Sequence, residues 1–203
     1  MIKKLMALSV DDGPNPETTE KLLSVLDKYG AKATFYFVGG LTDKKTGHIA
    51  KKVISSGNEI GNHGYDFKSL APLTADRVLS AFNNAQEAIF NVTGVYPETF
   101  RPAGLQTSDA LFSAIPVPVI GGYSPGPDWE DTFSVEERLA GLRKYAADGR
   151  ILLIHDVPLN IETLEIILPE FISEGYEIVT VSELAKRRNV KFTKNEKIIY
   201  REF

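Results

Sequence analysis

The sequence contains no cysteine, which excludes disulfide bonds, thiolate metal ligands and cysteine nucleophiles but leaves the redox compartment open. It has no apolar run approaching the roughly 18 residues of a membrane-spanning helix, so no membrane partner is expected. It also lacks an excess of basic charge. The formal net charge is −4 at pH 7, without a basic stripe, which argues against nucleic acid or another polyanion as a partner.

The composition is that of an ordinary globular protein, with 43% hydrophobic and 25% charged residues. The length of 203 residues suits one α/β domain, and no shift in composition marks a linker, so we expect a single domain over residues 1–203. Two lysines near the N-terminus precede a short apolar run, Leu5 to Val10. This run is too short for the core of a signal peptide and is predicted to be the first strand. The chain as written is therefore expected to be cytoplasmic or to lack its export signal.

Short apolar stretches alternate with amphipathic helical patterns along the chain. We predict strands at residues 5–10, 34–38, 58–61, 99–101, 117–121, 151–154 and 177–181, and helices at 46–56, 74–94, 108–115, 134–147 and 161–174. A further helix is expected between the start signal at Asn15 and Gly30, and Ser182 is expected to cap a last short helix. The tail from Val190 is expected to form an exposed strand or hairpin. This alternation is typical of a parallel sheet or barrel.

Six polar residues stand at or just after the carboxyl ends of predicted strands: Asp11, Asp12, His63, Arg101, Asp128 and His155. Taken singly, each has an ordinary structural explanation, such as a turn for the two aspartates or a hydrogen-bonded loop for a histidine. Adjacent carboxylates cannot be buried without partners, so Asp11 and Asp12 must face solvent or a cation. Because the carboxyl ends of parallel strands meet on one face of the fold, the serial arrangement predicts one site there.

Other enzyme classes fit these residues less well. Haloacid-type phosphatases use an Asp-x-Asp pair, whereas Asp11 and Asp12 are adjacent, and the chain has no Gly-x-x-x-x-Gly-Lys loop for phosphates. A glycosidase with two carboxylates would suit a barrel and the acidic pair. It would leave His63, Arg101 and His155 without roles.

Five short motifs resemble those of the polysaccharide deacetylases, also called the NodB-homology or carbohydrate esterase family 4 fold. They are Val-Asp-Asp-Gly-Pro (10–14), Gly-Asn-Glu-Ile-Gly-Asn-His (57–63), Phe-Arg-Pro (100–102), Asp-Trp (128–129) and Leu-Leu-Ile-His-Asp (152–156). Segments 30–38 and 175–184 are similar to the family as well, so the resemblance covers nearly the whole chain. It implies an α/β fold, a distorted (β/α) barrel of seven or eight mostly parallel strands. It also implies hydrolysis of N- or O-acetyl groups on a glycan or a related small acetylated substrate.

The resemblance implies roles for individual residues. Asp12 and His63 would hold a divalent metal (Zn, Co, Mn or Ni), which would polarise the acetyl carbonyl and acidify a bound water. Asp11 would be the general base beside Arg101, whose positive charge favours the carboxylate form. His155 would be the general acid, oriented by Asp128.

Three further residues are expected to contact the substrate. A backbone N–H around Ala103 would meet the oxyanion of the tetrahedral intermediate. Trp129 and Leu153 would wall the space for the acetyl methyl group, although ordinary packing explains these two side chains equally well.

The sequence departs from the family pattern in three motifs; in the fourth motif, Pro125 stands where the family often has an acid. The second motif of the family reads His-Ser/Thr-x-x-His, whereas this chain has Phe67 at the place of the second metal-binding histidine. The third motif, Arg-Pro-Pro-Tyr-Gly, is shortened here to Arg101-Pro-Ala-Gly. Two interpretations remain open: Asp66 replaces the missing ligand, or the chain is a catalytically impaired member that binds glycans as a pseudoenzyme. The survival of the remaining polar residues favours an active hydrolase, because buried charges without a role cost stability.

Overall fold

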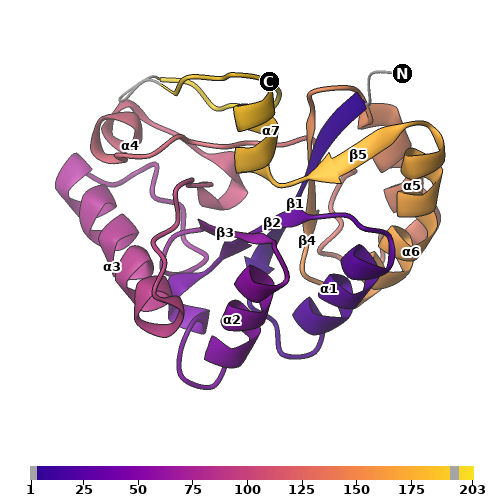
Figure 1. Cartoon of the computed structure of the whole chain (residues 1–203). Coiled ribbons are helices and arrows are strands. Elements are labelled where there is room, and N and C mark those ends of the chain that lie inside the picture. The colour runs from indigo at the N-terminus through magenta and orange to yellow at the C-terminus, as the bar shows by residue number, and fades with distance from the viewer. Residues whose placement is uncertain (1–3, 193–196) are drawn as a thin grey trace.

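A computed structural model describes residues 4–192 and 197–203 (Figure 1). Its central strand is β1 (Lys4–Gly13), which lies between β2 (Ala33–Phe37) and β4 (Ile151–His155) and is parallel to both. β3 (Glu59–Asn62) extends the sheet beyond β2, and β5 (Tyr176–Val179) pairs with the first half of β1. The predicted parallel α/β organisation is confirmed.

Single parallel bridges continue the sheet beyond β3. Phe100 bridges both Asn62, at the end of β3, and Val119, and Tyr123 bridges Leu152 in β4. The pairings therefore run from β4 through β1, β2 and β3 to these bridged segments and return to β4, as in a distorted barrel. Within the described residues five strands pair in ladders, and residues 99–101 and 117–121 join the sheet through isolated bridges.

Helices cover the outside of the sheet (Figure 1). Those of the first half are α1 (Thr19–Lys28), α2 (Gly47–Ser55) and α3 (Ala75–Thr93). Those of the second half are α4 (Asp109–Ala114), α5 (Val135–Tyr145), α6 (Pro158–Ser173) and α7 (Val181–Arg187). Two short 3₁₀ helices, η1 (Gly39–Leu41) and η2 (Ala103–Leu105), follow β2 and the third motif.

The two faces of β1 serve different purposes because side chains alternate along a strand. Met6, Leu8 and Val10 belong to the main hydrophobic cluster, which they share with apolar residues of α1 and α6. Leu5 and Ala7 belong to a second, smaller cluster on the other face. Continuing along that face brings Ser9 and then Asp11 to the carboxyl end of the sheet, which positions the site described below.

Three helix starts differ from the sequence prediction. α6 begins at Pro158 and not at residue 161, because proline favours the first turn of a helix. Thr180 caps α7, not Ser182, whose hydroxyl instead donates to the carboxylate of Glu59. α1 begins at Thr19, later than the signal at Asn15 indicates, because the Asn15 side chain accepts a backbone N–H two residues on and forms a turn before the helix.

The predicted strand or hairpin in the tail falls partly on residues 193–196, which lie outside the described residues. After them, Tyr200 bridges Ile120 and Glu202 bridges Arg150. In the part of the chain that the structure describes, no helix is both long enough and apolar enough to cross a membrane.

Candidate active site

The centre of the site is a buried ion pair between Asp11 and Arg101. Asp11 lies inside β1, which continues to Gly13 and does not end at Val10 as predicted, because its pairing with β2 and β4 continues through this residue. Asp11 is 3% exposed and Arg101 is completely buried. Arg101 Nη1 donates to Asp11 Oδ1 at 2.6 Å and to Ser9 Oγ at 2.8 Å. The pair is therefore both charge-compensated and directionally fixed.

The remaining donors of Arg101 bind the backbone. Its Nε donates to the Ile120 carbonyl at 3.3 Å and its Nη2 donates to the Gly121 carbonyl. Its guanidinium also lies over the ring of Tyr36, 4.1 Å from the centroid. Arg101 thus ties β1 to the bridged segment around residue 120, so it acts on the stability of the barrel as well as on Asp11.

Asp12 and His63 face each other beside this pair. The backbone of Asp12 is left-handed, with φ at 73°, and its Oδ1 lies 3.3 Å from His63 Nε2. The other ring nitrogen of His63, Nδ1, donates to the Arg101 carbonyl at 2.8 Å, which turns Nε2 toward Asp12. His63 Nε2 is also 3.8 Å from Asp11 Oδ2. Two candidate ligands therefore converge on one point.

The charges of the site shift the pKa values of these two groups in opposite directions. Burial lowers the pKa of His63, but the negative charge of Asp11 and the contact with Asp12 outweigh burial, so the pKa is raised above 6.5. Burial raises the pKa of Asp12, but the hydrogen bond with His63 and the charges of His63 and His155 outweigh it, so the pKa is lowered below 3.8.

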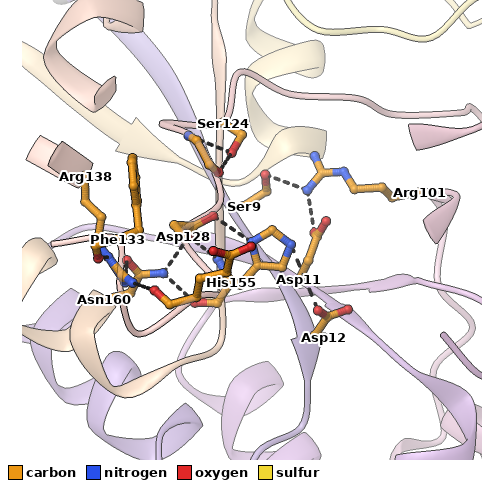
Figure 2. A network of polar contacts seen from close by, with 12 residues as sticks. Ser9, Asp11, Asp12, Arg101, Ser124, Asp128, Phe133, Arg138, His155 and Asn160 are labelled. Atoms are coloured by element: carbon orange, nitrogen blue, oxygen red, sulfur yellow. Dashed lines mark hydrogen bonds and ion pairs between the residues drawn. The ribbon is translucent and has the colours of Figure 1, made fainter. Parts of the chain in front are cut away.

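His155 ends β4 on the other side of Asp12. Its Nδ1 donates to Asp128 Oδ1 at 2.8 Å, and its backbone N–H donates to Asp128 Oδ2 at 2.8 Å (Figure 2). Its Nε2 lies 4.0 Å from Asp12 Oδ2. Burial lowers the pKa of His155, but the hydrogen bond to fully buried Asp128 outweighs it and the pKa is raised. His155 is thus oriented as an acid whose Nε2 points away from its partner.

Asp156, which follows His155, ties the ends of β1 and β4 together. Its carboxylate accepts from the hydroxyls of Thr18 and Thr19, and its backbone N–H donates to the Asp11 carbonyl at 2.9 Å. Burial raises its pKa even though the two hydroxyls lower it. Asp156 therefore acts on the backbone that presents Asp11 and His155.

A cavity of about 560 Å³ opens onto these groups. Asp11, Asp12, His63 and His155 all line it. So do the three residues predicted to contact the substrate: Ala103 at the start of η2, buried Leu153, and Trp129, which is 54% exposed. The Trp129 ring meets the His155 ring edge-on at 5.0 Å between centroids. The structure brings these predicted residues to a single site.

Asp66 is not brought into this cavity. Its side chain is about half exposed, and its carboxylate accepts the backbone N–H of Lys68 at 3.1 Å and pairs with the Lys68 ammonium at 3.1 Å. Phe67, by contrast, lines the cavity while remaining 60% exposed. In this arrangement the surface lysine engages the carboxylate that was expected to replace the missing ligand.

Ser124 also lines the cavity, in a segment with the letters of a Gly-x-Ser-x-Gly nucleophile turn, residues 122–126. Such a turn needs a strand before it and a helix directly after it. Here the segment is followed by an extended loop, and the Ser124 hydroxyl donates to the Gly126 carbonyl at 2.7 Å. Ser124 is therefore a loop residue and does not stand at the strand-to-helix turn that a serine nucleophile of this type requires.

Comparisons with known proteins identify the family. A family model described as polysaccharide deacetylase matches residues 1–115. A peptidoglycan-N-acetylglucosamine deacetylase of Bacillus cereus is 30% identical over 92% of this chain and 91% of the relative. The chain belongs to the polysaccharide deacetylase family. This confirms the resemblance carried by the five motifs.

Solved structures agree with this assignment. A family 4 acetyl xylan esterase from Clostridium thermocellum, solved in complex with a cobalt ion, has a TM-score of 0.94 and 36% identity, and the match covers 98% of both chains. Among the relatives found by sequence, a bifunctional xylanase/deacetylase from Pseudobutyrivibrio xylanivorans is 34% identical over 93% of this chain. That relative is much longer, since the chain spans 31% of its length.

The donor atoms of the site fit a divalent metal through two protein ligands. Asp12 offers a carboxylate oxygen and His63 the imidazole nitrogen Nε2, which faces that oxygen while Nδ1 is held by the Arg101 carbonyl. Among the described residues, no group of three or more His, Cys, Asp or Glu side chains is placed to hold a metal. Phe67, at the position where the family pattern leads us to expect a third ligand, has no donor atom. Water and substrate would have to complete the coordination.

Proposed function

We propose that this protein hydrolyses an acetyl group, linked to nitrogen or oxygen, on a saccharide. The observation that supports this proposal most strongly is the placement of a base and an acid at one cavity. Asp11 and His155 both line it, each is held by a buried partner of opposite charge, and Asp12 with His63 lies between them. A base that takes a proton from water and an acid that protonates the leaving group accelerate hydrolysis of an amide or ester.

Asp12 and His63 are the residues that would hold a divalent metal. When bound there, the metal would polarise the acetyl carbonyl and lower the pKa of a water at the site. A metal requires the carboxylate form of Asp12 and the neutral form of His63, and each form predominates only above the pKa of its residue. Because the pKa of His63 is raised, protons compete with the metal for its Nε2.

Asp11 would accept the proton of the attacking water. Its Oδ1 is occupied by Arg101, which leaves Oδ2 on the side of His63, 3.8 Å from Nε2. The guanidinium thereby selects which oxygen of the carboxylate is available to the reaction and prevents the side chain from rotating. Arg101 is a positioning residue in this scheme.

His155 would donate a proton to the leaving nitrogen or oxygen. Because Nδ1 is held by Asp128, the acidic proton resides on Nε2, which points toward Asp12 in the cavity. The raised pKa keeps more of the histidine in its acidic form near neutral pH. The water oxygen bonds to the acetyl carbon, and the bond from that carbon to the leaving nitrogen or oxygen breaks, which releases acetate. Asp11 gains one proton and His155 loses one, and exchange with solvent returns both groups to their starting forms.

The walls of the cavity would recognise the acetyl group. Trp129 and Leu153 present apolar surface next to His155, which suits a methyl group, and the exposed Trp129 ring also offers a face to a sugar. The backbone of Ala103 is the candidate donor to the oxyanion. The substrates named for the relatives, peptidoglycan and acetylated xylan, support an acetylated saccharide as the class.

Acetate release from acetylated chitooligosaccharides, acetylated xylo-oligosaccharides and peptidoglycan fragments tests the proposal. The wild-type protein supplied with Zn²⁺ or Co²⁺ should release acetate from at least one of them. His155→Ala, which removes the acid, should lose at least about a hundredfold in kcat/KM, the usual scale for an acid–base group. Asp12→Asn, which weakens the metal site, should lose at least as much. His48→Ala, which changes an exposed histidine in α2, should retain full activity. Variants of Asp12 and His155 that keep wild-type rates would refute the mechanism.

One observation favours a second candidate function, a glycan-binding protein without catalysis. Phe67 occupies the cavity wall where a metal ligand is expected. It is a second exposed aromatic ring in the cavity that Trp129 also lines, which suits saccharide stacking. This alternative predicts saccharide binding that is unaffected by EDTA, together with no acetate release from any substrate. Acetate release that EDTA abolishes would exclude it.

A further inference from the structure

A buried polar chain continues from His155 and Asp128 into the protein (Figure 2). It consists of Asn160, in the first turn of α6, and Arg138, on α5. Both side chains are completely buried, and neither lines the cavity. The general acid is therefore supported by residues that the substrate cannot reach.

The orientation of the Asn160 amide follows from its neighbours. Arg138 Nη1 donates to Asn160 Oδ1 at 3.2 Å, and a guanidinium can only donate. The amide nitrogen must therefore point the other way, where Nδ2 donates to Asp128 Oδ2 at 2.7 Å and to the His155 carbonyl at 2.8 Å. Arg138 sets the direction in which Asn160 donates.

Arg138 is itself held by the loop that carries Asp128. Its Nε donates to the Phe133 carbonyl at 2.9 Å and its Nη2 to the Glu130 carbonyl at 2.8 Å. The loop, α5 and α6 are thus joined at one point directly behind the acid. This anchoring fixes the backbone of the Asp128 loop, and Asn160 fixes its side chain.

The carboxylate of Asp128 needs such a constraint, because the terminal torsion of an aspartate is broad and not confined to a few staggered values. Its Oδ2 accepts from Asn160 and from the His155 backbone, while its Oδ1 accepts from the His155 ring. Removing Asn160 leaves one donor on Oδ2 and allows the carboxylate to rotate. Rotation would release the His155 ring from the orientation that directs Nε2 to the substrate.

We propose that Asn160 is a positioning residue for the general acid, acting through Asp128, and that Arg138 sets the direction of its amide. The kinetic consequence rests on the proposed function, whereas the geometric consequence does not. Because Asn160 lies outside the cavity, its loss should lower kcat and leave KM nearly unchanged.

The test compares Asn160→Ala with Thr163→Val. Thr163 is a matched control: it lies on α6, is completely buried, and its hydroxyl donates to the Leu159 carbonyl at 2.9 Å without contact to Asp128. The first measurement is the proton NMR signal of the hydrogen-bonded Nδ1–H of His155, assigned by its absence in His155→Gln. The second is kcat and KM on a saccharide that the wild-type protein deacetylates.

Asn160→Ala should broaden or shift the Nδ1–H signal and lower kcat about 10- to 100-fold, the scale found for residues that orient a functional side chain. KM should stay within about twofold, and Thr163→Val should leave the signal and kcat unchanged. If Asn160→Ala does not fold, Asn160→Asp preserves the size of the side chain and should still shift the signal, because it alters the charge beside Asp128.

An Nδ1–H signal that is unchanged in the Asn160 variants would overturn the proposal, as would a kcat loss no larger than that of Thr163→Val. A wild-type protein without turnover would refute the proposed function alone. The NMR comparison requires no substrate, so it would still decide whether Asn160 holds the pair.

Discussion

Replacing Arg101 by methionine should destabilise the protein strongly. The variant removes a completely buried guanidinium that donates to Asp11, to Ser9 and to two backbone carbonyls, and it leaves Asp11, at 3% exposure, without its guanidinium partner. Breaking a buried ion pair by removing one partner typically costs about 3–5 kcal/mol. That is a large part of the roughly 5–15 kcal/mol by which native proteins are stable.

The double variant separates the ion pair from general packing. Asp11→Asn keeps an acceptor for Arg101 but removes the charge, so it should cost less than Arg101→Met. The two changes together should cost about 1–3 kcal/mol less than their sum, because the carboxylate that Arg101→Met leaves uncompensated is then absent. Additive effects of the two substitutions would show that the charge pair is not the cause.

Urea unfolding followed by circular dichroism measures these differences, provided that the slope of the transition stays constant. Arg143→Met is the matched control. Arg143 donates to Glu170 through two nitrogens at 2.8 and 2.7 Å, but the pair lies at the surface with half-exposed side chains. Solvent screens such a pair, so its loss should have little effect on the midpoint. If Arg101→Met lowers the midpoint no more than Arg143→Met does, our account of the centre of the site is wrong.

Three further predictions concern activity and metal binding. The alkaline limb of the kcat–pH profile should lie above pH 6.5, because activity needs the protonated form of His155 and the pKa of His155 is raised. Asp128→Asn should move this limb to lower pH, because it removes the carboxylate that raises this pKa. Phe67→His should tighten Zn²⁺ binding, measured by calorimetry, by at least about tenfold, because it supplies a third protein ligand. Trp129→Ala should lower kcat/KM about fivefold, equivalent to about 1 kcal/mol, by raising KM. The stability toward urea should change little, because the Trp129 ring is half exposed and is placed to contact substrate more than the core. An alkaline limb that does not move in Asp128→Asn would contradict the role given to Asp128. Unchanged Zn²⁺ affinity in Phe67→His would contradict the proposed metal site, and an effect of Trp129→Ala on kcat alone would contradict its role in substrate binding.

The sequence allowed the position of the site to be predicted because strand ends are easy to recognise. Apolar runs that stop at a polar residue locate Asp12 and His155 at one edge of a parallel sheet, and a short predicted strand before Asn62 adds His63. The structure places all three at one cavity. The end of β1 was less predictable. Asp11 is polar, yet it continues the ladder, since Arg101 from a distant segment compensates its charge.

Features set by distant partners were not predictable from local patterns. Nothing in the sequence indicates that Lys68 engages Asp66, because a surface ion pair has no signature beyond two nearby charges. Asn160 was missed for a similar reason. It is an ordinary residue near a predicted helix start, and its contacts with Asp128 and Arg138 bring together segments more than twenty residues apart in sequence. One sequence feature could have revealed it. Proline favours the first turn of a helix, so Pro158 predicts a helix start directly after the strand that ends at His155, which places Asn160 near the carboxyl end of β4.

The central claim is that Asp12 and His63 hold a catalytic divalent metal although Phe67 replaces the third ligand. Calorimetric titration of the metal-free protein with Zn²⁺ tests this claim most directly, with Asp12→Asn as the disabled site and Asp66→Asn as the control outside the cavity. We predict one-to-one binding by the wild-type protein, the same binding by Asp66→Asn, and its loss in Asp12→Asn. Identical binding, or none, in the wild-type protein and in Asp12→Asn would contradict the account.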